Sequence, residues 1–188
     1  MRTAIIALML ALPLVQGCGA LVVGGAAATG VVISQDRRTM GTLTEDEGIE
    51  LKAASRIGER YRDGAHVNVT SYNRMVLLTG EMPDAAAKAA AGKIAQAVEN
   101  VRSVFNELQI GPNTALSARA NDTYLTSLVK ARFVDAQRFS PVHVKVVTEA
   151  SVVYLMGLVM RKEADAATEI ARTTRGVHRV VRVFEYLD

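Results

Sequence analysis

The distribution of hydrophobic and polar positions divides the chain into an apolar leader, a lead-in of low complexity and a patterned remainder. Residues 4–12 form an uninterrupted apolar run, AIIALMLAL. Residues 19–47 are dense in Gly and Ala, keep no helical or strand period, and become polar toward their end. Beyond them, apolar residues recur at helical spacing and then alternate at strand spacing. We therefore expect a tether followed by a folded part.

The patterned remainder is an internal duplication. The segment HVNVTSYNRMVLLTG at residues 66–80 matches HVKVVTEASVVYLMG at residues 143–157, at an offset of 77. Both segments begin with His-Val-x-Val and end with Leu-x-Gly. The apolar residues Ile49, Ala53 and Ile57 match Leu125, Val129 and Phe133 at an offset of 76. One deletion in the intervening helix explains the change of offset, so the chain contains two copies of one unit.

Each copy predicts the element order helix, strand, strand, helix, strand. The first helix carries apolar residues at i, i+4 and i+8, and the two strands that follow alternate. Turns at residues 72–74 and 149–151 join these strands into hairpins, and Gly80 and Gly157 mark a sharp turn or close approach of the backbone. Final strands are expected at 101–109 and 177–187. The predicted fold class is α+β, with two tandem αββαβ two-layer sandwiches.

The second helix of each unit predicts a face of small residues. These residues are Ala87, Ala90, Ile94 and Val98 in the first copy, and Ala164, Ala167, Ala171 and Thr174 in the second. A unit of about 65 residues buries a thin core, so we expect the two copies to pack on each other.

The domain boundaries follow from these patterns. We expect a signal peptide at 1–17, an acylated N-terminus and tether at 18–45, a first domain at 46–110, a linker at 111–120 and a second domain at 121–188. Asn121 or Asp122 is the expected N-cap of the first helix of the second domain.

The start of the chain has the layout of a bacterial export signal. Arg2 precedes the apolar run, which falls short of the roughly 20 residues that a spanning helix needs. Leu14–Cys18 reads LVQGC and contains the only cysteine of the chain. It resembles a lipobox, which implies acylation of Cys18 and cleavage just before it. The alternative is a stray thiol in a secreted protein. Gly19, in place of an Asp that favours inner-membrane retention in enterobacterial lipoproteins, implies the outer membrane.

Composition and charge argue against nucleic acid and against catalysis. The formal net charge of +3 falls to +2 when the leader with Arg2 is removed, which is too little to indicate a nucleic-acid partner. The three histidines lie on separate predicted elements and show no metal-ligand spacing. No nucleophile elbow, phosphate loop or zinc-protease pattern occurs in the sequence. We therefore expect no enzyme, no metal and no cofactor.

The two copies differ beside the core face of their first helix. The positions are Gly48, Lys52 and Arg56 in the first copy, and Tyr124, Leu128 and Arg132 in the second. A tyrosine above a leucine with a nearby cation suits the interface of an anionic bilayer. In the alternative, Tyr124 and Leu128 pack against the other copy or the linker.

The repeated unit resembles the BON domain. The stretches that carry the likeness are NVTSYNRMVLLTGE, NDTYLTSLVKARF and VYLMGLV, and two such units behind LVQGC resemble the dual-BON-domain outer-membrane lipoproteins of Gram-negative bacteria. The resemblance implies a lipid-anchored protein on the periplasmic face of the outer membrane. It further implies that the first helix of the second domain binds anionic phospholipid such as phosphatidylglycerol. The implied contact residues are Tyr124, Leu125, Leu128, Val129 and Arg132.

Two details of the implied site differ from the family pattern. The family aromatic is tryptophan where this chain has Tyr124, and Leu128 replaces a basic residue. Leu125 and Val129 are expected to be mainly core residues that shape the helix. The implied role is support of envelope integrity, with recruitment to sites such as the division septum. The alternative function is an adaptor that binds outer-membrane assembly factors or cell-wall remodelling factors.

Overall fold

The computed structural model describes residues 36–188, which contain two α+β domains that share the order helix, strand, strand, helix, strand, with one additional short strand, β4, in the first. The predicted fold class is therefore confirmed. Cys18 and the predicted signal peptide lie outside the described residues. The first domain consists of α3 (Met40–Tyr61), η2 (Arg62–Gly64), β1 (His66–Tyr72), β2 (Met75–Met82), α4 (Ala85–Gln96), β3 (Ser103–Asn106) and β4 (Gln109–Ile110). The second consists of α5 (Leu116–Ala136), η3 (Pro141–His143), β5 (Val144–Glu149), β6 (Val152–Val159), α6 (Arg161–Arg172) and β7 (Arg179–Tyr186).

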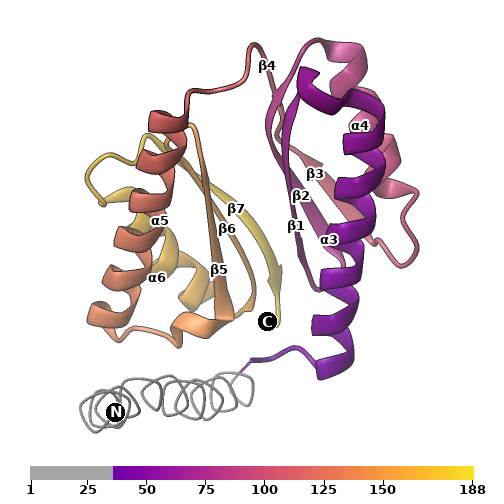
Figure 1. Ribbon diagram of the computed structural model, residues 1–188. Coiled ribbons are helices and arrows are strands. Elements are labelled where there is room, and N and C mark those ends of the chain that lie inside the picture. The colour runs from indigo at the N-terminus through magenta and orange to yellow at the C-terminus, as the bar shows by residue number, and fades with distance from the viewer. Residues whose placement is uncertain (1–35) are drawn as a thin grey trace, which may run out of the picture. The chain divides into compact units, whose positions relative to one another are not determined.

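Each domain is a sheet covered by two helices on one face (Figure 1). In the first domain β2 pairs antiparallel with β1 and parallel with β3 and β4. In the second domain β6 pairs antiparallel with β5 and parallel with β7. The central strands β2 and β6 read as nearly continuous apolar runs because both of their faces are buried.

The predicted core residues of the first helices are confirmed. Ile49, Ala53 and Ile57 are buried on α3, and their counterparts Leu125, Val129 and Phe133 are buried on α5. The predicted face of the second helix is confirmed for α6. On α4 the buried face centres on Ala87, Ala91 and Ala95, one position away from part of the prediction. Ala90 and Ile94 are only partly buried.

Gly80 and Gly157 permit the close backbone approach that their sequence positions predict. A Cβ at Gly80 would lie 2.0 Å from the carbonyl oxygen of His66, and a Cβ at Gly157 would lie 2.3 Å from that of His143. Gly80 also has a φ of +109°, which favours glycine. Both glycines are therefore required by the pairing of the two hairpin strands.

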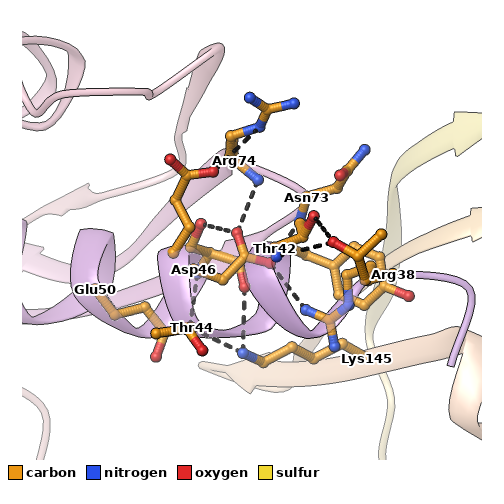
Figure 2. A network of polar contacts seen from close by, with 12 residues as sticks. Arg38, Thr42, Thr44, Asp46, Glu50, Asn73, Arg74 and Lys145 are labelled. Atoms are coloured by element: carbon orange, nitrogen blue, oxygen red, sulfur yellow. Dashed lines mark hydrogen bonds and ion pairs between the residues drawn. The ribbon is translucent and has the colours of Figure 1, made fainter. Parts of the chain in front are cut away.

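Both hairpin turns are confirmed, and each is held by an aspartate from the first helix. The turn residues Asn73 and Arg74 have positive φ, as do Ala150 and Ser151, which matches tight two-residue turns. The Asp46 carboxylate accepts the N–H groups of Asn73 and Arg74 (Figure 2), at 2.8 and 2.7 Å. The equivalent position in the second domain is Asp122.

Asp122 therefore serves a different purpose from the predicted helix cap. Its carboxylate accepts the N–H groups of Ala150 and Ser151 at 2.9 and 2.8 Å. Helix α5 begins at Leu116 with Ala115 as N-cap, so the predicted cap at Asn121 or Asp122 was wrong. The helix extends upstream because LSARA supplies good helix-forming residues before the first buried position.

Two other element boundaries differ from expectation. Helix α3 begins at Met40, inside the predicted tether, because the side chain of Thr39 accepts the N–H of Thr42 and caps the helix. The final strand of the first domain is divided into β3 and β4 instead of running through 101–109.

The two sheets pack against each other through the faces that carry no helices. Their contact forms a third buried cluster, with Tyr72 and Leu77 from the first domain and Tyr154, Met156, Leu158 and Val183 from the second. Lys145 pairs with Glu50 at 2.9 Å across this contact (Figure 2). The alternation of the central strands β2 and β6 therefore fills two cores, one beneath the helices and one between the domains.

Candidate functional site

Helix α5 carries the three predicted positions Tyr124, Leu128 and Arg132 as a stripe beside its buried face. Leu125 and Val129 are buried against the sheet, and their spacing fixes the rotation of the helix. Tyr124 consequently points outward with 62% of its surface exposed, and Leu128 is partly exposed. Tyr124 is thus a surface residue, and the alternative in which it packs against the other copy or the linker is wrong.

A shallow hollow lies beside Tyr124, with a volume of 280 Å³. It is lined by Asn121, Tyr124, Leu125, Leu128, Arg175 and Gly176. Gly176 has a φ of +93°, and a Cβ there would lie 2.9 Å from Leu125. Glycine at this position therefore lets the loop between α6 and β7 lie against α5 and brings Arg175 next to the stripe.

Arg175 is the cation of this hollow. It is exposed, and within residues 36–188 it has no hydrogen bond or ion pair. Sequence reasoning missed Arg175 because it lies in a loop 51 residues from Tyr124. The repeat alignment offered a signal, since the equivalent residue of the first copy is Glu99 and the charge is reversed.

Arg132 is already engaged within the second domain. Its Nη1 donates to the carbonyl oxygen of Ile170 at 2.9 Å and to Thr174 Oγ1 at 2.7 Å. Its Nη2 donates to Thr173 Oγ1 at 3.2 Å. These bonds satisfy groups at the C-terminal end of α6, where a cation also complements the helix dipole.

The first domain has a hollow at the equivalent place with different chemistry. Its lining includes Glu45, Gly48, Lys52, Glu99 and Asn100. Gly48 stands where the second domain has Tyr124, and Lys52 stands where it has Leu128. The first hollow therefore carries two carboxylates and a lysine beside Ile49, whereas the second combines Tyr124, Leu125 and Leu128 with an arginine.

One group of side chains in the described part of the chain has the composition of a metal site. His66, Glu81 and Glu149 place one ligand atom each within 4.8 Å of one another. No local pattern indicates this group, because its members belong to three strands in two domains. The hairpin register pairs His66 with Glu81, but Glu149 comes from the second domain.

Arg37, which precedes α3, forms an ion pair with Glu163 of α6, and the pKa of Glu163 is lowered. Arg37 donates to both carboxylate oxygens of Glu163, at 2.7 and 3.0 Å. Burial raises the pKa of Glu163, but the hydrogen bonds from Arg37 and from the Met160 N–H, with the charges of Arg37 and His143, outweigh burial and lower it below its ordinary value.

Within residues 36–188, no helix combines the length and apolarity that a transmembrane segment requires. The predicted lipidation site at Cys18 precedes these residues.

Comparison with known proteins identifies the repeated unit. The sequence pattern of the BON domain matches residues 45–112 and 121–188. The chain is 39% identical to outer membrane lipoprotein DolP of Haemophilus influenzae, over 92% of this chain and 90% of that protein. It is 32% identical to a 21 kDa hemolysin of Actinobacillus pleuropneumoniae, over 81% of this chain and 80% of that protein. It is 28% identical to osmotically-inducible protein Y of Escherichia coli, over 81% and 78%.

Proposed function

We propose that this chain is an outer-membrane lipoprotein that binds anionic phospholipid. The premise is that it belongs to the BON domain family and contains two BON domains. The relative in Haemophilus influenzae is named an outer membrane lipoprotein and shares most of its length with this chain. The lipobox-like LVQGC supports acylation at Cys18 and a periplasm-facing anchor. The family is not enzymatic, and we assign the chain a binding function.

The observation that carries the phospholipid proposal is the hollow of the second domain. Tyr124 is exposed there beside Leu128, and Arg175 keeps its guanidinium without a partner in the described residues. A tyrosine ring settles at the headgroup level of a bilayer, while an arginine meets phosphate oxygens. Of the two equivalent hollows, only this one combines apolar side chains with an arginine.

The proposed contacts are individually weak, and the anchor adds to their effect. A cation near an anionic membrane contributes about 1 kcal/mol. Two acyl signals already hold a protein stably at a bilayer, so the anchored domain meets the surface at high effective concentration. In this proposal Tyr124 and Leu128 contact lipid, Leu125 and Val129 position the helix, and Arg132 contributes charge near the surface.

Vesicle flotation of residues 37–188, which form one compact unit, tests the proposal. We expect wild type to float with phosphatidylglycerol vesicles and to stay behind with phosphatidylcholine vesicles. Tyr124→Glu should abolish flotation, because it adds a negative charge where the ring would enter the interface. Gly48→Glu is the matched control in the first domain, where an added Cβ meets nothing within 4 Å. Equal flotation of wild type and Tyr124→Glu would refute the assigned surface.

The cellular role that we assign is support of envelope integrity, with recruitment to lipid-rich sites such as the division septum. This follows from the proposed lipid preference and from the likeness to the outer-membrane relatives. Imaging of a fluorescent fusion tests it. Loss of septal enrichment in Tyr124→Glu, with the Gly48→Glu fusion unchanged, is the expected result.

An adaptor function has a separate observation in its favour. Leu51 on α3 is 73% exposed and lines a hollow of 380 Å³ together with Ala54, Val69, Glu47 and Glu50. The equivalent residue in the second domain is Ser127. A protein partner such as an outer-membrane assembly or cell-wall factor would bind there. Photocrosslinking from position 51 in cells distinguishes the functions, since a single dominant protein adduct favours the adaptor.

A further inference from the structure

Three side chains with metal-binding groups meet where the first domain contacts the second. His66 and Glu81 face each other across β1 and β2, with Nδ1 and Oε2 3.2 Å apart. Glu149 ends β5 of the second domain and reaches the same place, where its Oε2 accepts Asn68 Nδ2 at 2.8 Å. The pair in the first domain and the carboxylate of the second thus form one mixed group of an imidazole and two carboxylates.

The two carboxylates are almost fully buried. The side chains of Glu81 and Glu149 are each about 95% buried. Glu81 accepts the N–H and hydroxyl of Thr114 at 3.2 and 3.3 Å. Within residues 36–188, neither carboxylate lies in ion-pair distance of a lysine or arginine. Two neighbouring buried carboxylates repel each other and lose hydration, so the site favours binding of a positive charge.

A polar hollow connects this group with solvent. It has a volume of 240 Å³ and is lined by His66, Asn68, Arg119, Asp122, Thr123, Thr126, Thr148 and Glu149. Asp122 is occupied by the hairpin N–H groups, and Arg119 donates to Thr114 Oγ1 at 3.5 Å. His66 and Glu149 are therefore the lining residues through which an ion would enter the group.

The opposite end of the domain contact shows how the chain neutralises its own acids. At that opposite end, the positions equivalent to His66, Glu149 and Glu81 are occupied by His143, Tyr72 and Leu158. Arg37 pairs with Glu163 beside His143, and the guanidinium of Arg38 lies 3.8 Å from the centre of the Tyr72 ring.

Lysine and arginine thus supply the positive charge at that end. Lys145 pairs with Glu50 at 2.9 Å, and Arg38 pairs with Asp46 at 3.0 Å (Figure 2). At the end with His66, the position of Lys145 is occupied by Asn68. The same architecture therefore pairs its acids with lysine and arginine at one end, whereas within residues 36–188 no lysine or arginine forms an ion pair with Glu81 or Glu149 at the other.

We propose that His66, Glu81 and Glu149 bind a zinc ion that links the two BON domains. A neutral imidazole with two carboxylates is a donor set that suits Zn²⁺, whereas Mg²⁺ and Ca²⁺ prefer oxygen ligands alone. Three protein ligands leave a fourth position toward the hollow. The ion would replace the missing internal cation and would join β1 and β2 of the first domain to β5 of the second.

Zinc titration of the full mature chain in detergent solution tests this proposal. We expect one zinc ion per chain by calorimetry and no saturable binding of Mg²⁺ or Ca²⁺. At a free zinc concentration of about 100 times Kd, Tm should rise by roughly 5–10 °C. Glu149→Gln keeps an acceptor for Asn68 but removes the charge, and it should weaken zinc binding by roughly 10-fold or more.

The internal repeat supplies the matched control. His66→Asn should remove both the calorimetric binding and the zinc-dependent rise in Tm, whereas His143→Asn should keep both. A circular dichroism spectrum of each variant without zinc establishes that it is folded. Absence of zinc binding by wild type, or equal loss in His66→Asn and His143→Asn, would overturn the proposal. The phospholipid proposal does not depend on this result, because Tyr124 lies outside the group.

Discussion

The two BON domains of one chain keep the same fold but present different surfaces at an equivalent hollow. In the first domain Gly48, Lys52 and Glu99 line it, and in the second Tyr124, Leu128 and Arg175 take these places. The buried residues on the same helices keep their spacing and their apolar character. The duplicated core thus constrains where a surface can form, while the residues just beside that core determine the chemistry of that surface.

Both domains share an aspartate on the first helix that binds the hairpin turn. Asp46 and Asp122 each fix a hairpin turn whose two central residues have positive φ. Asp46 accepts additional bonds, from Ser71 Oγ at 2.7 Å and from Arg38 Nη1 at 3.0 Å. The two positions therefore have the same function but different numbers of partners.

Alanine substitution at these two positions tests that comparison and gives the largest expected effect. Asp46→Ala removes the acceptor of two turn N–H groups and of Ser71 Oγ and removes the ion pair with Arg38, and it should lower the free energy of unfolding by about 4 kcal/mol. Asp122→Ala removes the acceptor of two N–H groups and should cost about 2 kcal/mol. Urea denaturation of residues 37–188 measures both. An equal or larger cost for Asp122→Ala would show that the additional partners of Asp46 contribute little.

The sequence predicted most of the fold because its main signals are local. The i, i+4, i+8 spacing identified the buried face of α3 and α5, and the paired hairpins followed from alternation and turn length. The start of α5 was wrong because Asp122 has the chemistry of an N-cap but bonds a distant hairpin instead. A local sequence pattern does not show whether a carboxylate accepts the N–H groups at the start of its own helix or those of a distant hairpin turn.

The candidate site was predicted only in part for a similar reason. Tyr124 and Leu128 were found by helical position, whereas Arg175 comes from a loop whose approach depends on Gly176. His66, Glu81 and Glu149 meet only after two sheets pack on each other. Contacts between domains carry no period along the chain, so sequence reasoning from one copy at a time does not reveal them.

The caps of the second helices provide a second test, with an intermediate effect. In α4 the Asp84 side chain accepts the N–H of Ala87, whereas in α6 Glu163 accepts the N–H of Met160 and also pairs with Arg37. Because the pKa of Glu163 is lower in the folded protein, its contribution to stability is present above the unfolded value of about 4.5 and is lost as the pH falls through the folded value.

Glu163→Gln should therefore lower stability by about 2 kcal/mol at pH 7, and the difference from wild type should vanish at acidic pH. Thermal unfolding between neutral and acidic pH measures the two curves. Asp84→Asn is the matched control for loss of a helix cap, because Asn remains a good N-cap residue and the change should cost only a small fraction of that amount. A constant gap between wild type and Glu163→Gln down to the lowest pH would exclude titration of Glu163 as its cause.

The smallest expected effect addresses the two hollows directly. Arg175→Gln removes one exposed cation from the second hollow, and Glu99→Gln removes one carboxylate from the equivalent position of the first. One cation near an anionic bilayer contributes about 1 kcal/mol, so Arg175→Gln should weaken binding to phosphatidylglycerol vesicles by about 5-fold. Glu99→Gln should leave the affinity nearly unchanged, because the first hollow does not face the lipid in this proposal.

The pair of variants separates a localised surface from a general charge effect. Each substitution changes the net charge by one unit, in opposite directions. If only net charge mattered, Glu99→Gln would strengthen vesicle binding by as much as Arg175→Gln weakens it. Repeating the titration at higher salt adds a second criterion, because screening should reduce the deficit of Arg175→Gln while the contribution of Tyr124 persists. A symmetric response of the two variants would mean that the divergence between the hollows does not determine where the lipid binds.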